Sequence, residues 1–323
     1  KESLQWLLLA IFCNCQLVSL PYSHEIALFN NELYQLSQQF VYFLEHNKLQ
    51  SAKRVLQLTN IKYPTSPEVL SMQGRTLRAK GDFIKGDVLI RKAIQAKAKE
   101  IQQNHPNTNL QQRMTLFSSI LFLGGNHTFF TLIGKMQLHA LQEQGLQPEH
   151  TVLDIGCGCL RAGYWLTQYL NPNCYYGIEP YKMSVYFGLH HVLGKELVTQ
   201  KRPTIKHHSD FTFSPFQKKF DFILARSIWT HTAQNQIITM LDEYTKWSTT
   251  KGVFLTSYIP TAPTEDSYDG YGWVGRSECS EKGGYTKHSF TWIEQKCKER
   301  NLHVEELEKY KTSEQTWLKI SHM

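Results

Sequence analysis

The chain of 323 residues carries a formal net charge of +7, and 41% of its residues are hydrophobic. This length and composition allow two domains of ordinary size, each with a real hydrophobic core. The seven cysteines are an odd set without the density of a disulfide-stabilised scaffold, which indicates a reducing compartment. Neither C-x-C pair has a second pair at zinc-ligand spacing, so we expect no metal site.

Residues 1–24 form an apolar N-terminal segment centred on Trp6–Leu20. This run is too short for a typical membrane span, and Asn14 and Gln16 interrupt it. We expect a packing helix. The alternative is a targeting or membrane segment, and a membrane contact would then be made only through residues 6–20.

Residues 25–100 contain a pattern that recurs after 34 residues, with a small residue early in the second helix of the later unit. This pattern resembles tetratricopeptide repeats, which implies an N-terminal all-α domain with two helix–turn–helix units over residues 33–98. A generic pair of helical hairpins is the alternative. The matching positions are Leu36 and Leu70, Phe40 and Gly74, Phe43 and Leu77, Asn47 and Gly81, Leu49 and Phe83, Ala52 and Gly86, and Leu56 and Ile90.

The basic excess of the chain belongs to this helical region. Between Lys48 and Lys99 there are twelve Lys or Arg residues and three Asp or Glu residues. Such a surface could attract a protein or another acidic partner, but a solvated basic helix face is the simpler interpretation. We do not expect nucleic-acid binding, because the stretch contains no recognised RNA-binding motif and no interleaved aromatic residues.

Residues 101–133 are predicted to be connector helices, and a strand–turn–helix–strand pattern follows them. Thr151–Ile155 is an apolar strand that leads directly into Gly156 and Gly158. A helix is predicted over Arg161–Leu170 and a second strand over Cys174–Ile178. This order is typical of a nucleotide-type ligand held at the carboxyl edge of a parallel sheet.

An acidic residue follows the second strand, 21 residues beyond Gly158. This residue, Glu179, has the spacing at which a carboxylate can accept hydrogen bonds from both ribose hydroxyls. A dinucleotide fingerprint would need a third glycine, but Leu160 and Arg161 occupy the positions where it would stand. Large side chains there hinder docking of a pyrophosphate, so the turn favours an adenosine ligand without phosphates.

The motifs VLDIGCGCLRAG and YYGIEP resemble the first and second motifs of class I S-adenosylmethionine-dependent methyltransferases. The resemblance covers residues 134–323 and implies S-adenosyl-L-methionine as the cofactor. It also implies an α/β fold with a Rossmann-like sheet of seven strands whose last hairpin is antiparallel. The residues that it assigns to the cofactor are Asp154, Gly156, Cys157 and Gly158 near the methionine part, Glu179 at the ribose, and Asp210 and Ala225.

Among these assignments Asp210 is the candidate acceptor for the adenine amino group, and a turn aspartate is the alternative. It follows a short third strand over Thr204–His208. The fourth strand is predicted over Phe220–Ala225, with a helix over Gln234–Trp247 behind it. The remaining expected elements are a strand over Gly252–Ser257, a helix over Ser289–Arg300 and a closing strand over Gln315–Ile320.

The residues after the fourth strand face the methyl group in this family, and His231 is the strong base among them. We therefore predict that His231 is the general base. The alternative is a histidine that hydrogen-bonds a loop or lines the pocket.

The segment Tyr258–His288 is too long for an ordinary loop, and its aromatic and polar residues suit a polyhydroxylated substrate under a lid. A surface insertion is the alternative. The candidate substrate residues are Arg161, Tyr258, Tyr271, Trp273 and His288.

We expect a cytoplasmic methyltransferase that transfers a methyl group in line to a hydroxyl of a sugar, glycan or natural product. Two alternatives stay open. The first is a protein or RNA methyltransferase whose helical repeats hold the polymer. The second is a catalytically inactive scaffold, against which the intact glycine turn and Glu179 argue.

Overall fold

The computed structural model describes residues 31–124, 127–262, 265–275, 284–310 and 315–323. The predicted segment Trp6–Leu20 lies outside the described residues. No helix in the described part of the chain combines the length and the apolar character needed to cross a membrane.

In the described part of the N-terminal half, four helices form two successive hairpins: α3 (Glu32–Glu45), α4 (Leu49–Lys62), α5 (Pro67–Ala79) and α6 (Phe83–Asn104). Side chains that accept hydrogen bonds from free backbone N–H groups mark three of the helix starts. Asn31 caps α3, Ser66 caps α5 with Pro67 in its first turn, and Asp82 caps α6. Helix α6 begins 34 residues after α4, and α5 begins 35 residues after α3.

The two helices of the second hairpin cross at glycines. A Cβ atom on Gly74 would lie 2.7 Å from the carbonyl oxygen of Gly86, and a Cβ on Gly86 would lie 2.7 Å from that of Gly74. Only residues without a side chain allow the backbones of α5 and α6 to approach so closely. The recurring small residue of the sequence pattern therefore has a packing function.

The predicted domain boundaries at residues 100 and 133 both fall inside helices. Helix α6 continues to Asn104, and α8 (Phe130–Glu143) starts before residue 134. The part between them contains α7 (Leu110–Phe117) and the short η1 (His127–Phe129). Helical periodicity continues through both positions, so no break in the pattern marks a boundary.

A single seven-stranded sheet forms the second half, in the order β3-β2-β1-β4-β5-β7-β6. The first five strands are parallel, whereas β7 runs antiparallel to β5 and β6. The predicted sheet of seven strands with an antiparallel last hairpin is thus confirmed. The strands are β1 (Val152–Ile155), β2 (Tyr175–Ile178), β3 (Thr204–Lys206), β4 (Phe220–Ala225), β5 (Ser248–Tyr258), β6 (Leu302–Leu307) and β7 (Thr316–His322).

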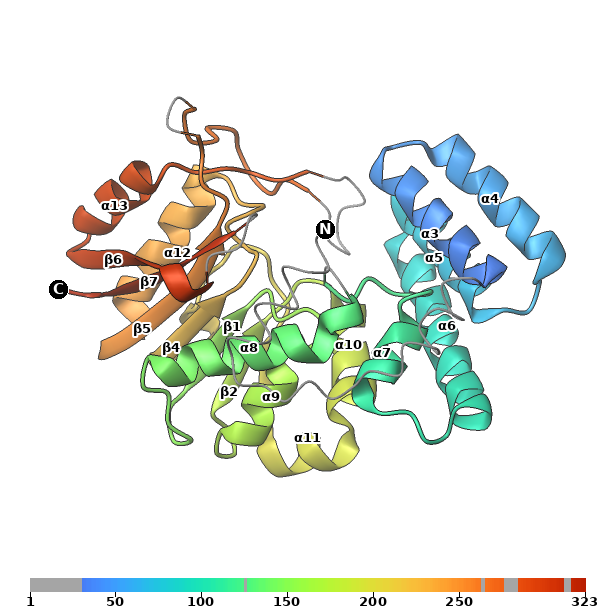
Figure 1. Ribbon diagram of the computed structural model, residues 1–323, viewed down its shortest axis with the longest axis horizontal. Coiled ribbons are helices and arrows are strands. Elements are labelled where there is room, and N and C mark those ends of the chain that lie inside the picture. Colours follow the sequence, from blue (N-terminus) through green and yellow to red (C-terminus); the bar gives the residue numbers. More distant parts are fainter. Residues whose placement is uncertain (1–30, 125–126, 263–264, 276–283, 311–314) are drawn as a thin grey trace.

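Helices cover both faces of this sheet (Figure 1). Along β4, Phe222 and Leu224 pack toward α8 and α9, whereas Ile223 and Ala225 pack toward α12 and α13. Strand alternation explains this division, because successive side chains point to opposite faces. The further helical elements are α9 (Arg161–Tyr169), α10 (Lys182–Phe187), η2 (Gly188–Leu193), α11 (Lys195–Lys201), η3 (Ser214–Phe216), α12 (Gln234–Trp247), α13 (Phe290–Lys298) and η4 (Glu308–Tyr310).

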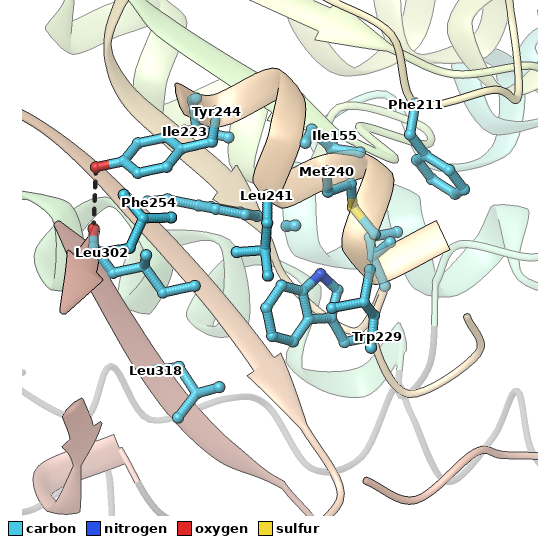
Figure 2. Packing of buried hydrophobic residues seen from close by; sticks show 14 of the residues in the cluster. Ile155, Phe211, Ile223, Trp229, Met240, Leu241, Tyr244, Phe254, Leu302 and Leu318 are labelled. Atoms are coloured by element: carbon cyan, nitrogen blue, oxygen red, sulfur yellow. Dashed lines mark hydrogen bonds between the residues drawn. The ribbon is translucent and has the colours of Figure 1, made fainter. Parts of the chain in front are cut away.

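Figure 2 shows the core between the sheet and α12, where the rings of Phe211, Trp229, Tyr244 and Phe254 pack among aliphatic side chains. Trp229 is fully buried, and its ring meets that of Phe254 edge to face with centroids 5.9 Å apart. The hydroxyl of Tyr244 donates to the carbonyl of Gly252 at 2.6 Å. This core fixes the segment that follows β4, where the predicted base is located.

A third core joins the two halves of the molecule. It combines Ile90 and Ile94 of α6 and Phe117 of α7 with Tyr181 and Phe187 from the region after β2. The rings of Phe117 and Phe187 lie 4.8 Å apart at an angle of 74°. The helical half therefore packs against α10, the helix that follows β2 (Figure 1).

Candidate functional site at the carboxyl edge of the sheet

The turn between β1 and α9 depends on two glycines with left-handed backbone angles. Gly156 has φ = +70° and Gly158 has φ = +52°. A Cβ on Gly156 would lie 2.2 Å from the Cδ1 atom of Ile228, which is part of the segment after β4. The turn is thus pressed against the segment that carries His231.

Space adjoins the turn at its second glycine. A Cβ on Gly158 would have no neighbour closer than the carbonyl oxygen of Gly156, at 3.9 Å. Behind the turn, the N–H groups of Gly156 and Cys157 both donate to the carbonyl of Ile178, at 2.8 and 3.1 Å. The tip of β2 therefore holds the turn in place.

Leu160 stands at the N-cap of α9 where a third glycine was considered, and it has φ = +63°. A left-handed conformation costs a residue with a Cβ atom about 1–2 kcal/mol. The side chain is fully buried in the core beneath the turn, and this burial offsets the cost.

The carboxylate of Glu179 reaches the glycine turn, and its predicted contact with a ribose stays a prediction. Its Oε2 atom accepts a hydrogen bond from the N–H of Gly158 at 3.1 Å, and its Oε1 atom accepts from the N–H of Tyr181 at 2.9 Å. Glu179 is half-buried. Two backbone donors therefore orient a partly accessible carboxylate at the edge of the sheet.

Asp154 lies deeper, inside the sheet. Its Oδ2 atom accepts a hydrogen bond from the hydroxyl of Tyr175 at 2.8 Å. Burial, with a smaller contribution from the nearby charge of Glu179, raises the pKa of Asp154 to about 7, while the Tyr175 hydroxyl and Arg161 act in the opposite direction. Tyr175 was not among the predicted site residues, because its hydroxyl comes beside Asp154 only when β1 and β2 pair.

Arg161 turns toward the connector rather than toward open space. Its Nη1 atom donates to the carbonyl oxygen of Gly124. Burial lowers the pKa of its guanidinium, and the nearby Cys159 and Asp154 oppose this shift. The predicted contact of Arg161 with an anionic ligand stays a prediction.

The other predicted cofactor residues take different positions. Cys157 is buried, and a Cβ on Gly177 would lie 2.7 Å from its Sγ atom. The carbonyl of the fully buried Ala225 accepts from the hydroxyl of Thr256 at 3.0 Å. Asp210 is exposed and accepts from the N–H and the hydroxyl of Thr212, at 3.1 and 2.9 Å. It thus makes the turn that was its alternative role, and the adenine contact stays a prediction.

His231 is fixed by the segment that lies over it. Its Nδ1 atom is 3.0 Å from the carbonyl oxygen of Val274, and its ring lies against those of Trp273 and Tyr285, with centroids 5.3 and 5.1 Å away. A carbonyl can only accept, so Nδ1 carries the proton in the neutral ring and Nε2 has the free electron pair. Burial lowers the pKa of His231, and the carbonyls of Val274 and Gly284 oppose this shift.

The described parts of the segment 259–288 are bonded to successive residues after β4. The N–H and the hydroxyl of Thr286 donate to the carbonyls of Thr230 and Trp229, at 2.8 and 3.1 Å. The N–H of Val274 donates to the carbonyl of His231 at 2.7 Å. The segment therefore forms a cover over the predicted base.

Two predicted substrate residues, Tyr258 and His288, are buried, and their contact with a substrate stays a prediction. Tyr258 is fully buried in the core, and its hydroxyl donates to Glu306. His288 is also fully buried, with Nε2 2.9 Å from the carbonyl of Thr232. Tyr258 is thus bonded to β6, and His288 to the segment after β4.

The remaining candidates differ in accessibility. Tyr271 is 88% exposed, whereas Trp273 is half-buried against His231. Within the described residues no three His, Cys, Asp or Glu side chains gather into a metal-binding group.

Comparisons with known proteins give distant likenesses. No protein-family model matches the chain, and no curated protein matches it. Among solved structures, magnesium protoporphyrin IX methyltransferase from Synechocystis PCC 6803 with bound SAH is similar to it with a TM-score of 0.45 and 12% identity, over 70% of this chain and 93% of that one.

Two further structures give the same TM-score of 0.45. The glycopeptide N-methyltransferase MtfA complexed with S-adenosyl-L-methionine is 10% identical, over 59% of this chain and 94% of that one. An S-adenosylmethionine-dependent methyltransferase from Clostridium acetobutylicum is 12% identical, over 61% and 96%. The function of this chain is therefore inferred from its own residues.

Proposed function

We propose that the chain is an S-adenosylmethionine-dependent methyltransferase. The observation that carries the proposal is the carboxylate of Glu179, which the Gly158 N–H orients at the sheet edge beside a turn with φ values of +70° and +52°. A half-buried carboxylate at this place suits the two hydroxyls of a ribose. The space at Gly158 suits close approach of a ligand to the backbone.

The residues present fit an adenosyl ligand without phosphates. Gly156 and Gly158 would line its methionine part and Glu179 would accept from its ribose, whereas the buried Leu160 gives α9 no glycine-rich phosphate cradle. The sulfonium of the bound cofactor supplies an activated methyl group. The protein then has to align the acceptor, exclude water and remove a proton.

We propose that the acceptor is a hydroxyl of a sugar, glycan or natural product and that His231 takes its proton at Nε2. The Val274 carbonyl holds the ring in the tautomer that a base needs. The cover formed by Trp273 and Tyr285 supports exclusion of water from the ring. Tyr271 is the exposed aromatic candidate for contact with the acceptor.

We also propose that α3–α6 are tetratricopeptide-like and that their basic surface binds an acidic or protein partner. The offset of 34 residues between α4 and α6 and the glycine contact of α5 with α6 support the first part. The composition between Lys48 and Lys99 supports the second. A cytoplasmic location is the corresponding expectation.

The proposal is tested by calorimetry with S-adenosylhomocysteine. We expect binding by the unmodified chain and a loss of at least about 10-fold in affinity for Glu179→Ala, because a charged hydrogen-bond acceptor is removed. Unchanged affinity in Glu179→Ala, with the fold intact by circular dichroism, would overturn the assignment of the site.

The acceptor is tested with methyl-labelled cofactor and fractionated cell extract. Label in small molecules or glycans supports O-methylation, and label in protein or RNA refutes it. His231→Ala should lower kcat by about 100-fold or more while cofactor affinity stays unchanged. Full activity in this variant would remove His231 from the mechanism.

A further inference from the structure

Tyr181 lies where the helical half meets the candidate cofactor site. Its N–H donates to Oε1 of Glu179 at 2.9 Å, two residues earlier in the chain. Its side chain is only 3% exposed and belongs to the core that α6 and α7 share with the sheet half. One residue thus connects the backbone that orients the carboxylate with the packing of the helices.

A guanidinium of the helical half covers the ring of Tyr181. The Cζ atom of Arg78, near the end of α5, is 4.3 Å from the centroid of this ring. Arg78 is itself buried and forms an ion pair with Asp87 of α6. A cation over an aromatic face is attracted by the ring quadrupole, and desolvation strengthens the attraction.

The repeat pattern of the helical half makes room for this arginine. A Cβ on Gly86 would lie 2.5 Å from the Cγ atom of Arg78. The glycine at the crossing of α5 and α6 therefore serves two purposes: it allows the helices to approach, and it lets the stem of Arg78 pass between them toward Tyr181.

We infer that Arg78 is a positioning residue for cofactor binding. The arginine fixes the ring of Tyr181, and the N–H of Tyr181 then holds the Glu179 carboxylate in the orientation that the Gly158 N–H also requires. The helical half thus contributes to the cofactor site without touching the ligand. This inference rests on the proposed function, in which Glu179 binds the ribose of an adenosyl ligand.

The same interface offers a matched control. Arg91 of α6 lies over the ring of Tyr186 with its Cζ atom 4.7 Å from the centroid. This contact is also a guanidinium over a tyrosine ring and joins the same two halves, with Arg91 exposed where Arg78 is buried. However, no hydrogen bond joins Tyr186 to Glu179 in the described structure, so removing it should change the packing of the interface and leave the carboxylate in place.

The test is calorimetry with S-adenosylhomocysteine on the full chain and its variants. We expect Arg78→Met to raise Kd by about 5- to 30-fold, the range of a desolvated cation–π contact. Arg78→Lys should restore most of the affinity, because it keeps the cation. Arg91→Met should change Kd by less than about 2-fold, even where its melting temperature falls as far as that of Arg78→Met.

A double-mutant cycle shows whether the effect passes through the carboxylate. The background is Glu179→Gln, which removes less of the side chain than Glu179→Ala. In this background Arg78→Met should raise Kd by less than about 2-fold further. Tyr181→Leu keeps the N–H and removes the ring, so it should reproduce Arg78→Met and replaces that variant if Arg78→Met does not fold.

The outcomes separate the two proposals. If the unmodified chain binds S-adenosylhomocysteine but Arg78→Met and Tyr181→Leu bind equally well, the inference about Arg78 is wrong and the proposed function stands. An undiminished effect of Arg78→Met in the Glu179→Gln background also overturns it. If the unmodified chain does not bind, the proposed function fails, and the inference fails with it.

Discussion

Replacing Asp154 by asparagine should change how the stability of the protein depends on pH. Burial holds the pKa of Asp154 at about 7, whereas the ordinary pKa of an aspartate is 3.8. The folded chain therefore binds this proton more tightly than the unfolded chain. Unfolding releases the proton between about pH 4 and pH 7, so the contribution of Asp154 makes stability fall as pH rises through this window.

The size of the effect follows from the two pKa values. One pKa unit corresponds to about 1.4 kcal/mol, so the buried carboxylate costs roughly 4 kcal/mol once pH is well above 7. Asparagine keeps an oxygen acceptor for the Tyr175 hydroxyl and carries no charge at any pH. Between pH 5 and pH 8.5 we expect the stability of Asp154→Asn to rise by about 2–3 kcal/mol relative to the unmodified chain.

Reversible urea unfolding at several pH values measures this difference, because the contributions of the other groups cancel to first order in the comparison. Tyr175→Phe is the companion variant: it removes a donor that stabilises the charged form, so the window should move to higher pH. A stability difference between Asp154→Asn and the unmodified chain that stays constant from pH 5 to pH 8.5 would refute the assignment of a raised pKa.

Three further outcomes follow from the described contacts. Leu160→Gly and Leu160→Ala both lose buried surface, but the glycine variant should be about 1 kcal/mol more stable in thermal or urea unfolding, because φ = +63° disfavours alanine; equal stabilities would contradict this. Gly86→Ala should destabilise the chain by about 1–3 kcal/mol, because its Cβ would lie 2.5 Å from Arg78; a gain from helix propensity would show that the helices can separate. Burial lowers the pKa of His231 below its ordinary value of 6.5, so kcat/KM should fall with decreasing pH only below pH 6.5. An acid limb of kcat/KM above that pH would exclude His231 as the base.

The strands and helices around the site could be predicted from the sequence because local patterns determine them. The bounds of β4 (Phe220–Ala225) and α12 (Gln234–Trp247) agree with the prediction at both ends, since apolar runs and helical spacing are local signals. The contact of Glu179 with the glycine turn follows from the fixed length of a strand–helix–strand unit.

The side-chain environments after β5 could not be predicted in the same way. Tyr258 and His288 have the composition of ligand contacts, but the fold places them in the interior, where Glu306 and Thr232 bind them. Which face of a long segment is buried depends on partners far away in the sequence. The same holds for Tyr181, whose partner Arg78 is about one hundred residues earlier and has no pattern that links it to the glycine motif.

The shared core also joins the parts of the chain on either side of the predicted boundaries at residues 100 and 133. The apolar faces of α6 and α7 are buried against the elements that follow β2, and the carbonyl of Leu123 accepts a weak hydrogen bond from Cys159 in the turn at 3.7 Å. Removing the helices would expose this core and leave Tyr181 without Arg78, while every residue of the glycine motif would remain present. Because the N–H of Tyr181 orients Glu179, the elements that hold the carboxylate extend into the helical half. The unit that positions Glu179 is therefore larger than the motif by which the sequence identifies it.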